Sequence, residues 1–290
     1  MGRNLSAFLI KEGHEVTALV RSEKRGRMLP SGVSMVVGES TQPGKWQESV
    51  PNHDLLINLA GATAFKRWND SYKKLLRESR IMTTRNLVDA IMDGKSVTLL
   101  SASGVGYYGF TGDEKLDETS PSGSDFFATL AGDWEAEALK ARGKGVRVIV
   151  TRFGVVMGRD GGALAQMVLP FRFFAGGPLG DGMQWVSWIH LEDLCRAALF
   201  VAKATSLDGP VNFTAPEPLR NKDLAREIGK VLGRPCFVPT PAFMISLVLG
   251  EFGSVILNGQ RVVPGVLQSR GFTFSYPEME GTLRNLLLEA

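Results

Sequence analysis

The sequence predicts an α/β fold, a doubly wound parallel sheet followed by a smaller C-terminal cap domain. Strands and helices alternate from residue 14 to about residue 210, as in parallel βαβ units with right-handed crossovers. The run Leu55–Leu59 is almost continuously apolar, as expected of a strand covered on both faces. We therefore expect a Rossmann-type domain over residues 1–210, including a substrate loop over 158–190, and a small cap domain over 211–290.

The first predicted elements are a helix and a strand. Leu5, Phe8 and Leu9 have helical spacing, Gly13 is a C-cap, and His14–Arg21 alternates as a strand does. In a doubly wound nucleotide-binding fold, a strand and a glycine-rich turn precede such a helix, whose N-terminus binds a pyrophosphate. Gly2 would be the last glycine of that turn. We expect roughly ten further residues upstream, about one strand and its turn; the alternative is a domain that starts with a helix.

The later elements follow from apolar runs and their periodicity. Strands are expected at Val33–Val37, Asp54–Ala60, Val97–Ser103, Val146–Arg152, Trp185–His190 and Val211–Thr214, and helices at Asp70–Met92, Phe126–Arg142, Asn221–Leu232 and Glu278–Leu288. Between residues 158 and 190, glycine pairs and prolines indicate a loop-rich wall of a cleft.

Composition excludes several classes of function. The chain has 290 residues, of which 44% are hydrophobic, and its net charge of +3 comes from 33 basic and 30 acidic residues spread along it. The sequence has no basic stripe of the kind that binds nucleic acids, so we expect no nucleic-acid partner. Cys195 in a predicted helix and Cys236 in a predicted strand lack metal-ligand spacing, so we expect no metal. Neither a membrane-spanning stretch nor a signal peptide is recognisable, which favours a cytoplasmic protein without a membrane partner.

The end of the second strand of such a fold contacts the adenosine ribose. Arg21 and Ser22 stand there, with Lys24 and Arg25 following, where an NAD enzyme usually has an acidic residue. A guanidinium pairs with phosphate, so this loop favours the 2′-phosphate of NADP(H). A solvated basic loop is the alternative.

Two further strand ends carry small or hydroxylated residues. Gly61, after the Asp54–Ala60 strand, lets a backbone approach a ligand, although a tight turn alone would also need it. The next strand ends with Ser101 and Ser103 and leads to Tyr107 and Tyr108, whose hydroxyl groups could orient or protonate a carbonyl. The two tyrosines could equally be hydrophobic plugs with a polar tip.

Two other polar motifs are interpreted as structural. His190 and Asp193 begin a predicted helix, where they would serve as N-terminal capping and charge compensation. Glu135, beside Trp134 on the Phe126–Arg142 helix, is taken as a packing and capping feature and is left out of the active site.

An ordered set of motifs resembles the extended short-chain dehydrogenase/reductases, within them the atypical subgroup called epimerase family or nucleoside-diphosphate-sugar epimerase-like proteins. The resemblance spans nearly the whole chain. It is carried by Gly13–Arg21, Asn58–Gly61, Ser79-Arg80 with Thr83-Thr84, Gly106–Gly109, Trp134-Glu135, Arg152–Gly158, Trp188–His190 with Asp193, Gly259–Val262 with Pro264, and Gly271-Phe272 before Tyr276-Pro277.

The resemblance implies a cofactor site and a departure from the usual chemistry. It implies that Arg21 and Ser22 contact the adenosine phosphate, Leu59 and Ala60 the cofactor backbone, Arg80 the cofactor, and Val156 the nicotinamide side; Gly2, Gly61 and Ser101 complete the candidate cofactor residues. The family's Tyr-x-x-x-Lys pair is replaced by Phe127 and Ala131. Ser103 matches the catalytic serine, and Tyr107 and Tyr108 are the nearest replacement phenols; Tyr108 matches the tyrosine that lies near substrate in sugar-nucleotide enzymes.

The sequence thus predicts an NADP(H)-binding oxidoreductase or epimerase that acts on a small polar substrate, for which a nucleotide sugar is one candidate. Because the acid/base pair is missing, a non-catalytic NADPH sensor is the alternative. A scaffold without a nucleotide is a third interpretation. A homodimer is the oligomeric state that the sequence leaves open.

Overall fold

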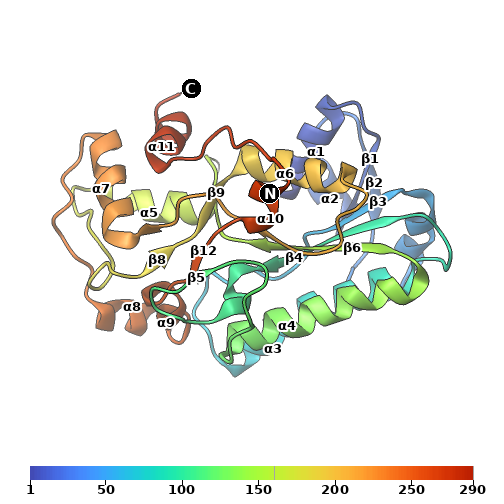
Figure 1. Cartoon of the computed structure of the whole chain (residues 1–290), viewed down its shortest axis with the longest axis horizontal. Helices are drawn as coiled ribbons and strands as arrows, with labels where there is room; N and C mark the ends of the chain where they lie inside the picture. The colour runs from blue at the N-terminus through green and yellow to red at the C-terminus, as the bar shows by residue number, and fades with distance from the viewer. Residues whose placement is uncertain (160, 290) are drawn as a thin grey trace.

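The structure is a computed structural model that describes residues 1–159 and 161–289, and it confirms the α/β fold (Figure 1). The main sheet has the order β10-β6-β4-β3, with every neighbouring pair parallel. Its strands are β3 (Leu55–Asn58), β4 (Thr98–Gly104), β6 (Arg147–Phe153) and β10 (Gly209–Phe213). The parallel pair β1 (Val16–Val20) and β2 (Val33–Val37) forms a separate sheet. The strand expected upstream of Met1 lies outside the described residues.

Helices cover both faces of the main sheet. The α-helices are α1 (Gly2–Lys11), α2 (Glu23–Gly26), α3 (Asp70–Asp89), α4 (Phe126–Leu139), α5 (Gly162–Arg172), α6 (Leu191–Lys203), α7 (Asn221–Leu232), α8 (Ala242–Leu249), α9 (Phe252–Leu257), α10 (Gly265–Ser269) and α11 (Met279–Leu287). Helices α3 and α4 pack against each other along one face, and α1 and α6 lie on the other (Figure 1).

The apolar strands supply both halves of the core. Leu99 on β4 belongs to the cluster under α3 and α4, whereas the next residue, Leu100, belongs to the cluster under α1 and α6. Val148 and Ile149 on β6 divide in the same way. Successive side chains of a strand point to opposite faces, so a continuously apolar strand can serve both cores.

Short elements complete the chain. The remaining strands are β5 (Lys115–Leu116), β7 (Val155–Met157), β8 (Trp185–Val186), β9 (Trp188–His190), β11 (Leu219–Arg220) and β12 (Arg261–Val262), and the 3-10 helices are η1 (Lys45–Asn52), η2 (Val105–Tyr108) and η3 (Lys140–Lys144).

The predicted elements exist with small shifts at their ends, and the largest difference lies in the 158–190 segment. We expected a loop there, but α5 occupies much of the described part, because Leu164, Val168 and Phe171 bury one apolar side. Glycines at either end hid this helix in the sequence. The predicted strand Trp185–His190 is two short strands, β8 and β9, and Cys236 lies outside any strand, contrary to expectation.

The segment after the main sheet builds a helical end of the molecule. Residues 209–213, which straddle the expected boundary at residue 210, form the edge strand β10. The helices α8 and α9 lie together at one end of the molecule, far from α1, and α7 packs with α11 (Figure 1). Strand β12 pairs with β5, which ties this segment to the loop after η2.

Candidate functional site

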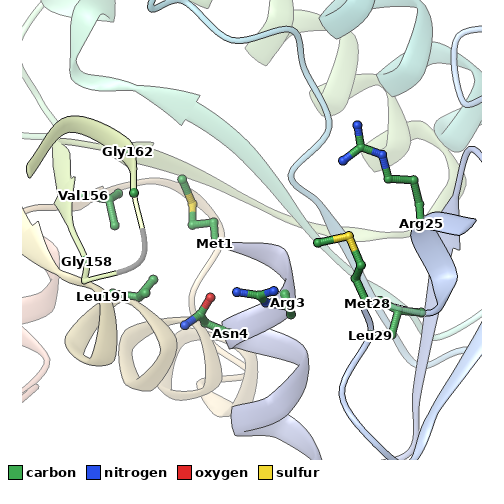
Figure 2. Close-up of a pocket in the computed structure, with 11 residues that line it drawn as sticks. Met1, Arg3, Asn4, Arg25, Met28, Leu29, Val156, Gly158, Gly162 and Leu191 are labelled. Carbon is green, nitrogen blue, oxygen red and sulfur yellow. The ribbon is translucent and has the colours of Figure 1, made fainter. Parts of the chain in front are cut away.

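A cavity of about 450 Å³ opens at the N-terminus of α1. Its walls come from the start of α1, the α2 turn, β7 with the following glycine loop, and the first residue of α6 (Figure 2). The residues that line it are Met1, Arg3, Asn4, Arg25, Met28, Leu29, Val156, Gly158, Gly161, Gly162 and Leu191. Gly2, which we expected at this place, is the first residue of α1, between two of the lining residues.

The cavity has the electrostatic character of an anion site. The first N–H groups of a helix have no intrahelical acceptor, and the helix dipole places partial positive charge at that end. The Arg3 and Arg25 side chains come from opposite walls of the same cavity (Figure 2). Phosphate groups fit such a set of donors, because guanidinium and backbone N–H groups are their usual partners in proteins.

Arg21 lies outside this cavity. Its side chain is 68% exposed and its Nε lies 3.5 Å from a carboxylate oxygen of Glu39. Ser22 is the N-cap residue of α2, and its side chain makes no capping hydrogen bond. Arg25, four residues further on, is the member of this basic loop that lines the cavity.

The loop after β3 holds the next group of predicted residues. The Ala60 N–H donates to Oδ1 of Asn58 (3.2 Å), and Leu59 packs against the core below. Gly61 lies directly against Arg80: a Cβ at Gly61 would stand 3.2 Å from the Arg80 Cζ. The structure therefore brings Leu59, Ala60, Gly61 and Arg80, four of the predicted cofactor residues, together.

Arg80 is held in place from below. Its Nη1 donates to the carbonyl of Leu76 (3.1 Å), and its guanidinium lies over the ring of Trp134, 5.1 Å from the centroid. Burial lowers the pKa of Arg80. A half-buried cation beside an exposed glycine loop is a further candidate partner for an anionic ligand.

A buried ionic network lies beneath the end of β4. The Ser103 hydroxyl donates to Oε1 of Glu135 (2.7 Å), and the Arg152 guanidinium donates to both Glu135 oxygens, at 2.9 and 2.8 Å. All three residues are buried. Burial lowers the pKa of Arg152, but its hydrogen bonds and attraction to Glu135 outweigh this and raise the pKa above its ordinary value. Our interpretation of Glu135 as a mere packing and capping residue was therefore wrong.

The two tyrosines of η2 have different surroundings. Tyr108 is 1% exposed; its hydroxyl donates to Oδ1 of Asn212 (2.7 Å) and accepts from Nη1 of Arg152 (3.0 Å). Burial raises the pKa of Tyr108 to about 12. Tyr107 is half-buried, and Cζ of Arg152 lies 3.5 Å from its ring centroid. Among the described residues, the Tyr107 hydroxyl has no hydrogen-bond partner, so it is the phenol that remains available to a ligand.

The position of the usual acid/base pair is occupied by apolar groups. The Phe127 ring packs 5.1 Å from Trp68, and a Cβ at Gly106 would meet it at 2.6 Å. Ala131 is buried one turn further along α4. Ser101 is also buried, and its hydroxyl has no partner in the described part of the chain.

His190 caps α6, as the sequence indicated, but the prediction that Asp193 also caps this helix was wrong. The His190 Nδ1 accepts from the N–H of Glu192 (3.0 Å) and caps α6. The Asp193 carboxylate accepts from the N–H groups of Ser275 and Tyr276, both at 2.8 Å, so it holds the C-terminal segment rather than its own helix end.

Sequence reasoning gave no site role to Arg152 and Asn212, and it named Arg25 only as part of the basic loop after Ser22. Arg152 and Asn212 complete the polar network, and Arg25 lines the cavity. A polar residue at the carboxyl end of an apolar strand is the signal that could have found the first two, since ligands of parallel sheets bind at that edge.

The described residues form neither a cluster of metal ligands nor a helix suited to span a membrane. In residues 1–159 and 161–289, no group of three or more His, Cys, Asp or Glu side chains is arranged to hold a metal ion. No helix of the described chain has the length and apolar character needed to cross a membrane.

The parallel sheet, with a helix N-terminus and polar side chains gathered at the carboxyl ends of its strands, defines a dinucleotide-binding protein of the extended short-chain dehydrogenase/reductase type. The model of the NAD dependent epimerase/dehydratase family matches residues 1–212, and the chain belongs to this family. A domain of unknown function, DUF1731, matches residues 240–286.

Relatives match along the whole chain. A chloroplastic homologue of epimerase family protein SDR39U1 from Arabidopsis thaliana is 38% identical over 99% of this chain and 84% of its own. Epimerase family protein YfhF of Bacillus subtilis is 35% identical over 100% of this chain and 95% of its own. Human SDR39U1 isoform 2, crystallised with NADPH, superposes with a TM-score of 0.87 at 33% identity, covering 100% of this chain and 96% of its own.

Proposed function

We propose that the protein binds NADP(H) and transfers a hydride to or from a small polar substrate as an oxidoreductase or epimerase. The cavity at the N-terminus of α1 is the observation that carries this proposal, because it combines helix N–H groups with Arg3 and Arg25. The NADPH bound to human SDR39U1, at 33% identity, supports the same cofactor here.

The residues fit the parts of the cofactor by their chemistry. Arg25, assisted by Arg21 from the same loop, would pair with the 2′-phosphate, and the start of α1 would receive the pyrophosphate. Val156 would lie on the nicotinamide side, and the loop Leu59–Gly61 with Arg80 would line the remaining length. When bound, NADPH supplies the hydride.

Tyr107 is our candidate for the acid that gives a proton to the substrate oxygen. In the reducing direction its O–H bond breaks, the proton passes to the carbonyl oxygen, and the phenolate keeps the electron pair. Arg152 would stabilise this phenolate, since its guanidinium lies against the ring. It would thus take the place of the lysine that the family usually has. In the oxidising direction the proton returns to Tyr107.

Ser103 and Tyr108 have supporting parts in this proposal. The Ser103 proton is directed at Glu135, so its oxygen has lone pairs to accept a hydrogen bond from a substrate hydroxyl. Tyr108 fixes the other edge of the Arg152 guanidinium. With its proton donated to Asn212, Tyr108 is the weaker candidate for proton transfer.

The alternative function is an NADPH sensor without turnover. It is favoured by the apolar packing of Phe127 and Ala131, which cannot transfer protons. Both functions require cofactor binding, and the nature of the substrate does not distinguish one function from the other. A nucleotide sugar is the substrate to try first, because a solved structure at 32% identity is named a nucleoside-diphosphate sugar epimerase.

The experiment measures cofactor binding and turnover separately. NADPH and NADH are titrated by fluorescence, and bound NADPH is then mixed in a stopped-flow instrument with carbonyl compounds and nucleotide sugars. We expect NADPH to bind more tightly than NADH, and turnover to be lost in Tyr107→Phe with binding retained. Firm binding with no turnover on any compound would favour the sensor, and no binding of either nucleotide would contradict both.

A further inference from the structure

An apolar surface lies exposed at the α8 end of the molecule. Its large side chains are between 56% and 74% exposed. We call it the apolar face and define it by six residues: Phe173, Phe174, Phe237, Phe243, Leu247 and Val248. A folded chain rarely leaves so many large apolar side chains in water without a use for them.

Contacts between their backbones bring together the three segments that carry these residues. The Val238 N–H donates to the carbonyl of Gly176 (3.1 Å), so residues 173–177 lie beside residues 236–240. A Cβ at Gly180 would come within 3.9 Å of the Ala242 Cβ, at the start of α8. Within α8, all of which the structure describes, Ile245 is the residue that is buried.

Helix α8 has no polar side that could face water. Its sequence is AFMISLVL, with Ser246 as its only polar residue. Phe243 and Leu247 are one turn apart, and with exposures of 70% and 69% they project from the molecule. Projecting apolar side chains of this kind can insert between the headgroups and acyl chains of a lipid bilayer.

Several cations near the apolar face have no carboxylate partner in the described part of the chain. They are Arg172, Arg234, Lys222, Lys66 and Arg67. Arg234 lies over the Phe174 ring, 4.2 Å from its centroid, and the Lys222 ammonium is 3.2 Å from the Met183 sulfur. The Arg67 side chain lies against Gly250, just past α8.

Most of the nearby carboxylates hold cations of this chain, whereas Asp181 accepts from the Met183 N–H and has no cation partner in the described part of the chain. Asp223 pairs with Arg226, Glu227 with Lys230 and Glu251 with Lys73. The rim of the apolar face is therefore net positive. A symmetric contact with a second copy uses the same patch on both copies, so it would bring two cationic rims together.

We propose that the apolar face docks on the surface of an anionic lipid bilayer. The phenylalanine and aliphatic side chains would enter the interface between headgroups and acyl chains, while the cationic rim would contact the anionic headgroups. Docking of this kind requires no spanning segment. It would hold the α9 end of α3, where Lys73 pairs with Glu251, close to the membrane.

The test is co-sedimentation of the full chain with vesicles of phosphatidylglycerol and phosphatidylethanolamine, against vesicles of phosphatidylcholine alone. We expect binding to the anionic vesicles that weakens as salt is added. Phe243→Glu should lower the partition coefficient about tenfold or more. The double variant Arg172→Gln, Arg234→Gln should lower it about 25-fold, at about fivefold for each cation.

Met92→Glu is the matched control. It makes the same change in charge at another exposed apolar residue, beyond the far end of α3, which is a 20-residue helix about 30 Å long. It should bind vesicles as the wild type does. NADPH titration of every variant checks that the fold is intact and keeps this proposal separate from the proposed function.

Three results with vesicles would overturn the proposal. They are absence of binding to the anionic vesicles, equal binding to both kinds of vesicle, and an equal loss in Met92→Glu. Analytical ultracentrifugation tests whether a second copy of the chain occupies the apolar face instead. A dimer that Phe243→Glu converts to monomer would assign the apolar face to that second copy. Binding of an acidic protein would overturn the lipid assignment only if that protein displaced the vesicles from the apolar face.

Discussion

The guanidinium of Arg152 lies over the ring of Tyr107, with 3.5 Å between Cζ and the ring centroid. The Glu135 carboxylate accepts two hydrogen bonds from the same guanidinium. The Arg152 side chain therefore cannot move away from the Tyr107 ring without breaking a buried ion pair. A cation beside a phenol is the arrangement that lowers the cost of forming a phenolate. In the proposed function, Arg152 on β6 takes the part of the lysine that the family usually has on the helix corresponding to α4.

The pair Glu135 and Arg152 should be essential for stability. Glu135→Gln leaves the Arg152 charge buried without a counter-ion, and we expect a loss of about 3–5 kcal/mol in the free energy of unfolding. Glu137→Gln is the control on the same helix, because its partners Arg85 and Lys140 have side chains 44% and 60% exposed and stay hydrated. Its loss should be about 1 kcal/mol or less. Urea denaturation of both variants is the measurement, and equal losses would contradict the distinction.

Tyr108 should matter for stability more than for proton transfer. Tyr108→Phe removes a hydroxyl that serves Asn212 and Arg152 at once, which leaves two buried polar groups without that partner. We expect a loss of about 1–3 kcal/mol. Tyr107→Phe should leave the free energy of unfolding nearly unchanged, since its hydroxyl bonds to no described residue. A larger loss for Tyr107→Phe than for Tyr108→Phe in thermal and urea unfolding would refute this assignment.

Cofactor discrimination should depend on Arg25 more than on Arg21. A charge-assisted hydrogen bond to phosphate contributes about 1.5–3 kcal/mol, so Arg25→Gln should weaken NADPH binding about tenfold or more and leave NADH binding unchanged. Arg21→Gln, in the same loop, should have a smaller effect because Arg21 lies outside the cavity and near Glu39. Fluorescence titration with both nucleotides gives the two ratios. If Arg21→Gln has the larger effect, the 2′-phosphate site lies at Arg21 instead.

The sequence identified the elements whose patterns are local. β3, β4 and β6 were predicted from apolar runs, and α7 was predicted with its observed bounds. It missed α5, whose apolar side is framed by glycines, and it named no helix in the part of the cap domain where α8 to α10 lie. In these segments tertiary packing overrides a local signal that favours turns.

Site residues could be predicted only where their position at the end of a strand, or in a family motif, assigns them a role. Gly61 and Arg80 stand together as the strand-end argument and the family resemblance implied. The bond from Ser103 to Glu135 joins residues 32 apart, and that from Tyr108 to Asn212 joins residues 104 apart. No periodicity within one helix or strand reveals such partners, which is why Glu135 was misjudged.

His190 should make the fold sensitive to mildly acidic pH. Burial lowers the pKa of His190, which accepts the Glu192 N–H at Nδ1 and lies 3.9 Å from the Tyr276 ring between centroids. Because the folded pKa is below the unfolded value of about 6.5, the unfolded chain takes up the proton first as the pH falls. Stability is therefore full above about pH 6.5 and declines from there toward the folded pKa.

The variant His190→Asn isolates this effect, since asparagine retains an N-cap acceptor but has no proton to gain. Between pH 7 and pH 5 the wild type should lose up to about 2 kcal/mol more in the free energy of unfolding than the variant does. His14→Asn, at an exposed position after α1, is the control and should follow the wild type. Urea titrations at several pH values measure the difference; parallel curves for wild type and His190→Asn would mean that the buried imidazole does not set the acid sensitivity.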